Sequence, residues 1–161
     1  MDRLTGPVHI DTLSVTTFTP PDSCVGNSQV IAAAGIDASK VDPQPRYTYS
    51  QDGTAADVTG QVIGVVRGTT GAIQEVIAGS RVANVGNATV RIRVKKNGTN
   101  ILSTAIVLTS SHAAYAVVDG TVSVSAVAHD NVLTADISAI TGTGTLASDV
   151  FVQVLVYEDS V

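Results

Sequence analysis

The chain has 161 residues, a formal net charge of −5 and only 14% charged residues. The negative balance argues against nucleic-acid binding, because a phosphate backbone requires a positively charged surface. A single cysteine, Cys24, excludes an internal disulfide and a cysteine-based zinc site. No apolar run reaches the ~18 residues that span a bilayer, and the first residues lack the layout of a signal peptide. We therefore expect no nucleic-acid or membrane partner.

The composition favours β-structure with an aliphatic core. Valine occurs 26 times and threonine 19 times, and these β-branched side chains suit a pleated, half-buried surface. There are only four Tyr, two Phe and no Trp, so little aromatic surface is available for burial. Because the charged fraction is below the roughly 25% of typical soluble domains, we expect part of the surface to be covered in an obligate assembly.

All five prolines lie within the first 45 residues. Proline removes a backbone donor, so this region is not an ordinary central-sheet segment. Residues 8–19 have strand composition and end at Pro20-Pro21. We predict that residues 1–54 form an extended, proline-containing N-terminal arm and connector. Its apolar side chains are candidates for contact with a partner: Val8, Ile10, Leu13, Val15 and Phe18.

From about residue 58 onward, strand-like segments alternate with turn signals. The predicted strands are 61–67, 72–78, 81–85, 89–96, 100–108, 113–118, 121–127, 132–138 and 149–157. Turn signals every 8–12 residues or so are typical of a β-sandwich or jelly roll. We therefore predict an all-β fold in which residues 55–161 form a jelly-roll-like antiparallel β-sandwich.

Residues 89–108 predict an antiparallel hairpin with one basic, solvated face. Apolar residues alternate with Arg91, Arg93 and Lys95, which places the charges on one side of the strand. Asn97-Gly98 then supplies two residues that tolerate positive φ, a strong hairpin signal. The basic stripe Arg91, Arg93 and Lys95 is either an ordinary solvated face or a docking face for an acidic partner, including another copy of this chain.

The last predicted strand is apolar on both faces. Valines at alternate positions from 150 to 156 are interleaved with Phe151, Gln153, Leu155 and Tyr157. This pattern indicates either a central strand or one that is buried between subunits.

No arrangement of residues predicts catalysis. Ser110-Ser111-His112 and His129-Asp130 contain the residue types of a catalytic triad, but neighbours in a strand point to opposite faces. The histidines have no ligand spacing for a metal, and the glycine-rich turns lack the Lys-Ser/Thr of a phosphate loop. We expect a protein that is not an enzyme and that has no catalytic residues, cofactor or metal.

Several motifs resemble one family of virion proteins. They include Val65-Val66-Arg67-Gly68-Thr69-Thr70-Gly71, the segment Gly86–Val90 that leads into Lys95-Lys96-Asn97-Gly98-Thr99, and Asp130-Asn131-Val132-Leu133. Together with Asp37–Val41 and Arg46–Gln51 upstream, they resemble head decoration, cement or head-fibre proteins of tailed bacteriophages. The similarity covers roughly residues 37–157, and its motifs are turn and strand patterns.

The resemblance implies a homotrimeric jelly roll that binds the major capsid protein on the outer surface of the virion. It also implies a protein that is made in the host cytoplasm and stabilises the shell. The alternative is a carbohydrate- or receptor-binding β-sandwich of a phage fibre or adhesin. Sugar sites present exposed aromatic rings, for which the candidates are Tyr47, Tyr49, Tyr115 and Tyr157.

Overall fold

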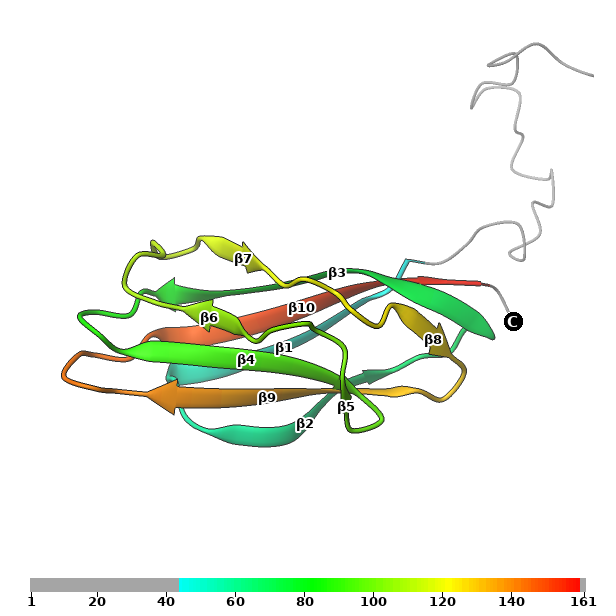
Figure 1. Cartoon of the computed structure of the whole chain (residues 1–161), viewed down its shortest axis with the longest axis horizontal. Helices are drawn as coiled ribbons and strands as arrows, with labels where there is room; N and C mark the ends of the chain where they lie inside the picture. Colours follow the sequence, from blue (N-terminus) through cyan, green and yellow to red (C-terminus); the bar gives the residue numbers. More distant parts are fainter. Residues whose placement is uncertain (1–43, 160–161) are drawn as a thin grey trace, which may run out of the picture. The chain divides into compact units, whose positions relative to one another are not determined.

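The computed structural model describes residues 44–159, and these residues contain only β-strands and connecting loops (Figure 1). The first 43 residues of the predicted arm lie outside the described part. The strands are β1 Arg46–Thr54, β2 Val58–Val65, β3 Thr70–Val82, β4 Thr89–Lys96, β5 Thr99–Asn100, β6 Ile106–Leu108, β7 Val117–Asp119, β8 Ala126–Ala128, β9 Val132–Ile140 and β10 Ser148–Glu158.

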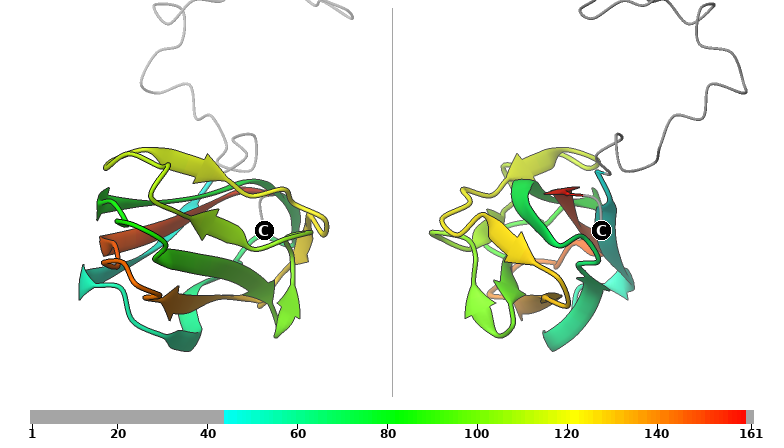
Figure 2. Two further views of the ribbon diagram at one scale, coloured as in Figure 1. Left: turned by 60° about the vertical axis from the view of Figure 1, so that its left-hand side comes forward. Right: turned by 90° about the vertical axis from the view of Figure 1, so that its right-hand side faces the viewer.

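The strands form two antiparallel sheets that pack face to face (Figure 2). Sheet A has the order β1-β10-β3, with the short strands β7 and β8 sharing the far edge of β3. Sheet B has the order β2-β9-β4, with β5 and β6 sharing the far edge of β4. Most connections cross from one sheet to the other, so the two split strands complete the eight-position winding of a jelly roll. The predicted fold class is confirmed.

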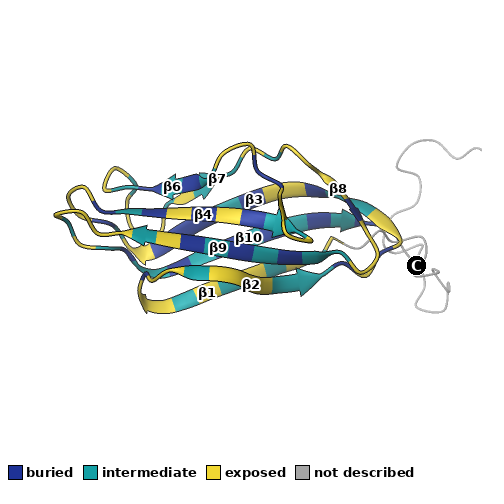
Figure 3. Cartoon of the chain, turned by 60° about the horizontal axis from the view of Figure 1, so that its bottom comes forward, coloured by how far each residue is buried: buried dark blue, intermediate teal, exposed yellow. Residues whose placement is uncertain are grey.

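The core is aliphatic, as the composition predicts. Alternate residues of each central strand point inward, and Val150, Val152, Val154 and Val156 of β10 are fully buried. They share one core with buried side chains of β4 and β9 in the other sheet, among them Ile92 and Leu133. Buried positions alternate with more exposed ones along these central strands (Figure 3). Strand β10 lies between β1 and β3, so it is a central strand of sheet A, one of the two arrangements that its apolar faces indicate.

The sandwich begins earlier than the predicted boundary at residue 55. Strand β1 belongs to the predicted connector, yet it pairs with β10 from Arg46 to Thr54. The tyrosines of the segment explain this placement, because Tyr47 and Tyr49 pack against the core while the intervening residues are exposed. Pro45 stands just before the strand, where it costs no ladder hydrogen bond within β1.

Some predicted strands have different bounds. The segments 72–78 and 81–85 belong largely to one long strand, β3, which continues to Val82. Residues 113–127 contain mainly turns, the short strand β7 and the start of β8, together with an isolated bridge between Leu102 and Val122. The short strand β7 pairs with β3 at only three positions, so the strand lengths predicted from the sequence for this region are too long.

The predicted hairpin is confirmed at its turn. Asn97 and Gly98 have φ values of 48° and 84°, the pair of left-handed conformations that a two-residue hairpin loop requires. The return strand is interrupted, because β5 ends at Asn100 and pairing with β4 resumes only in β6. Ile101 and Leu102, which lie in the interruption, are buried in the core.

Candidate binding surface

The outer face of sheet B carries the predicted basic stripe. Val90, Ile92 and Val94 of β4 are fully buried between the sheets, so the intervening residues point to solvent. Arg91 and Arg93 are exposed, and Lys95 is half-buried. The alternation of apolar and basic residues in the sequence therefore corresponds to the inward and outward faces of β4.

The structure divides these cations into two kinds. Lys95 forms an ion pair with Asp136 of the neighbouring strand β9, and Lys96 donates a hydrogen bond of 2.7 Å to the carbonyl oxygen of Ala126. Within residues 44–159, no carboxylate forms an ion pair with Arg91 or Arg93. Two guanidinium groups on adjacent outward positions of β4 are thus available to a ligand.

A shallow groove of about 380 Å³ runs beside these arginines. Arg91 and Arg93 form one wall, Ile137 and Ser138 of β9 lie along the groove, and the start of β2 at Val58 forms the opposite wall. A regular sheet presents a flat face, but β2 departs from regular pairing with β9 between Val58 and Gln61. The groove therefore lies where the pairing of β2 with β9 is irregular.

The two carboxylates that line the groove already have hydrogen-bond donors. Asp57 accepts a hydrogen bond of 2.7 Å from the Ala139 N–H. Asp136 accepts one of 2.8 Å from the Gly60 N–H and also pairs with Lys95. Desolvation alone would raise the pKa of Asp136, but these two donors and the nearby charge of Arg93 outweigh it and lower the pKa. Arg91 and Arg93 therefore outnumber Asp57, the one carboxylate of the groove that has no ion-pair partner among the described residues, and this positive balance suits an anionic partner.

Asp136 should make the stability of the protein depend on acid. Its pKa in the folded state is below the ordinary value of 3.8, so its contribution is complete above that pH and is lost as the pH falls through the folded pKa. We expect Asp136→Asn to be less stable than the wild type at pH 7 by about 1 kcal/mol or less, as for other partly screened ion pairs. Thermal melts at a series of pH values from 7 downward measure this difference, which should shrink as the pH falls below 3.8. A difference that did not shrink in the acid range would contradict the assignment.

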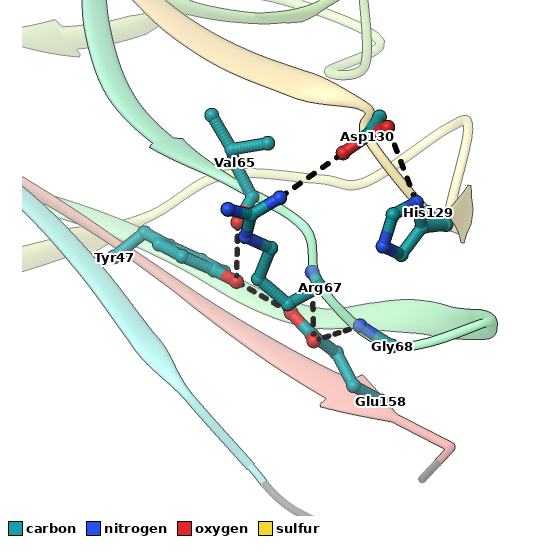
Figure 4. Close-up of polar contacts among 7 residues, drawn as sticks. All are labelled: Tyr47, Val65, Arg67, Gly68, His129, Asp130 and Glu158. Atoms are coloured by element: carbon teal, nitrogen blue, oxygen red, sulfur yellow. Dashed lines mark hydrogen bonds and ion pairs between the residues drawn. The ribbon is translucent and has the colours of Figure 1, made fainter. Parts of the chain in front are cut away.

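A second polar cluster closes one end of the sandwich (Figure 4). Glu158, the last residue of β10, is 3% exposed, and its carboxylate accepts a 2.5 Å hydrogen bond from the Tyr47 hydroxyl. The N–H groups of Arg67 and Gly68 donate to its other oxygen at 3.1 and 2.6 Å. Burial and the adjacent carboxylate raise the pKa of Tyr47 well above its usual value. The cluster joins β1, β10 and the β2–β3 connection, so we assign it a structural role.

The residues of triad type take part in local contacts. His112 Nδ1 accepts a 3.0 Å hydrogen bond from the N–H of Thr109, which ties it to its own loop. His129 Nδ1 lies 3.2 Å from a carboxylate oxygen of Asp130, and the other oxygen of Asp130 pairs with Arg67 at 3.2 Å. These contacts stabilise surface loops at the strand ends.

The four candidate tyrosines differ in accessibility. Tyr115 is 73% exposed and has a φ of 63° in the loop before β7. The ring of Tyr47 lies against Gly64, where an added Cβ would be 2.1 Å from its Cδ1 atom. Tyr49 packs against the core and Tyr157 is half-buried. Tyr115 alone among them presents its ring broadly to solvent.

The remaining candidate residues, Val8, Ile10, Leu13, Val15 and Phe18, lie outside the described residues. Within residues 44–159 no cluster of three or more His, Cys, Asp or Glu side chains could hold a metal ion. The same residues include no helix with the length and apolarity needed to cross a membrane. Comparisons with protein-family models, with curated proteins and with solved structures find no match for the chain.

Proposed function

We propose that the chain is a structural virion protein that decorates and stabilises a tailed-phage capsid by trimeric binding to the outer shell. The motif resemblance described above suggests the class, and the unpaired Arg91 and Arg93 on the outer face of sheet B carry the proposal. These arginines lie on a broad β-sheet rather than in a deep cleft. Such a surface suits docking on an extended macromolecular partner with acidic side chains.

The rigid support of the arginines favours this role. Both belong to β4, which pairs with β9 over eight residue positions and whose inward side chains are fully buried. Their backbone positions are therefore fixed before a partner arrives, which limits the entropy lost on binding. The neighbouring Lys95–Asp136 pair further orders the face.

The alternative function, binding of a carbohydrate or receptor by a fibre or adhesin, is favoured by one observation. Tyr115 presents its ring to solvent at the tip of a loop, as a sugar-stacking residue requires. A glycan site of this kind would depend on Tyr115 and not on the arginines of sheet B.

Substitution of both arginines tests the proposal. Full-length wild type and the Arg91→Glu/Arg93→Glu variant are incubated with capsids assembled from the major capsid protein of the same genome, then sedimented. We expect the double reversal to weaken binding by at least about 100-fold, because two attractive contacts become repulsive. Raising the salt concentration should weaken the wild type but not the variant.

Arg67→Glu/Arg81→Glu is the matched control, because it changes the net charge equally through exposed arginines elsewhere. This control should still bind capsids. Unchanged binding by the Arg91/Arg93 variant, or no binding by the wild type, would overturn the proposed surface. Loss of glycan-array binding on Tyr115→Ala, without capsid binding, would favour the alternative.

A further inference from the structure

The outer face of sheet A has an apolar strip along its centre, which is interrupted only at Gln153 of β10. Phe151, Leu155 and Tyr157 point outward from β10 and are half-buried in the single chain. The ring of Phe151 extends over Gly79 of β3, since an added Cβ there would lie 2.6 Å from its Cζ atom. Val117 of β7, which pairs with Gly79, is 55% exposed and widens the strip.

Charged residues flank this strip on opposite sides. Arg46 of β1 and Glu75 of β3 both pair with Leu155, so the three residues form one row across the sheet. Asp119 of β7 lies in the next row, beside Ile77. At this end of the sheet, the β1 border of the face is therefore positive and the β3–β7 border is negative. Toward the other end, Arg81 of β3 forms an ion pair with Asp149 of β10, and the exposed Asp52 of β1 lies near that pair, so charges of both signs are present there.

The charges of Arg46 and Glu75 have no opposite partner within the described chain. The Arg46 guanidinium donates a 2.9 Å hydrogen bond to the side-chain oxygen of Gln153, a neutral group. Glu75 is exposed and forms no ion pair with residues 44–159. Leu155 stands between them, so each charge faces outward at the border of the apolar strip.

We propose that copies of this chain assemble through the outer face of sheet A, around an axis parallel to its strands, with Arg46 of each copy against Glu75 of the next. Rotation about such an axis leaves the height of every residue along the axis unchanged. It also brings the β1 side of one copy next to the β3–β7 side of its neighbour. Because Arg46 and Glu75 share a row, they meet at the same height.

A second copy fits this face because the face is complementary to itself. Its central strip supplies apolar area for burial, and its two borders supply opposite charges at matching positions. Two or three copies can form a closed ring with this contact. The choice of three copies rests on the proposed trimeric function, whereas the contact itself does not. It leaves the outer face of sheet B, with Arg91 and Arg93, available for the capsid.

Charge reversal and charge swapping test the interface. Sedimentation equilibrium of the full-length chain, over a range of concentrations at low salt, gives the dissociation constant of the assembly. We expect Arg46→Glu and Glu75→Arg each to weaken self-association by about tenfold or more, because each creates a like-charge contact. The Arg46→Glu/Glu75→Arg double swap should restore it to within about threefold of the wild type.

Arg67→Glu is the matched control, since it makes the same change in net charge at an exposed side chain that pairs with Asp130 before β9, and it should leave assembly unchanged. Circular dichroism under dissociating conditions checks that each variant folds. A monomeric wild type, single reversals without effect, or a swap that fails to restore assembly would overturn the interface. Co-sedimentation with capsids is scored separately: swap-dependent assembly without capsid binding would refute the decoration role and leave the interface standing.

Discussion

A chain that begins at residue 55 should fail to form a stable sandwich, whereas a chain that begins at residue 44 should unfold in one cooperative transition. Removal of β1 eliminates seven paired positions along β10 and the inward side chains of Tyr47 and Tyr49. Truncation of one packed aromatic residue costs about 3–5 kcal/mol, which is comparable to the whole stability of many domains. It also leaves β10, the central strand of sheet A, as an exposed edge.

Circular dichroism and limited proteolysis of the two truncated chains measure this effect. The chain from residue 44 should give a β-type spectrum, a sharp melt and a protease-resistant fragment. The chain from residue 55 should give a broad melt and rapid digestion. A sharp melt at the same temperature for both would show that β1 is dispensable and would restore the boundary predicted from the sequence.

Glu158→Ala should be the most destabilising substitution of a charged residue within the described chain. Its removal leaves the N–H groups of Arg67 and Gly68 without their carboxylate acceptor in a site from which water is largely excluded. The Tyr47 hydroxyl also loses the carboxylate but keeps the Val65 carbonyl oxygen at 3.1 Å as an acceptor. Each buried donor that loses its partner costs about 1–3 kcal/mol, so we expect a loss of about 2 kcal/mol or more.

Urea unfolding at pH 7 measures this loss, with Asp52→Ala as the control for an exposed carboxylate. Tyr47→Phe removes the hydroxyl that donates to Glu158 and to the Val65 carbonyl oxygen but keeps the ring, so it should cost about 1 kcal/mol. Glu158→Gln should fall between the two, because a neutral amide oxygen accepts hydrogen bonds more weakly than a carboxylate. A Glu158→Ala variant within 0.5 kcal/mol or so of the control would mean that water replaces the carboxylate.

Local patterns in the sequence predict the elements whose structure is decided locally. The alternation through Arg91 and Arg93 predicts which side chains of β4 point outward, and Asn97-Gly98 predicts the hairpin turn. The two apolar faces of β10 predict either a central strand or one buried between subunits, and the strand is central in sheet A. In each case, side-chain periodicity or backbone conformation follows from neighbouring residues alone.

Features that depend on distant residues are not predictable in this way. Tyr47 and Glu158 are 111 positions apart, and only the winding of the jelly roll brings them together. The sequence likewise does not distinguish Lys95, which Asp136 engages, from Arg91, which remains unpaired. The prolines before β1 favour a connector there, and its partner β10 lies about a hundred residues later in the sequence, so local patterns do not reveal the pairing.

The pairing of β1 with β10 also constrains how the protein folds during synthesis. Sheet A places the first strand of the sandwich beside the last, and an Arg46–Gln153 hydrogen bond joins residues 107 positions apart. Closing so long a loop costs conformational entropy before the contact contributes stabilising free energy. Such topologies therefore fold slowly, on the order of milliseconds to seconds. During synthesis on the ribosome, β1 remains unpaired until residues beyond 150 have emerged. An unpaired strand is prone to aggregation, so we expect chaperone binding to protect this nascent segment.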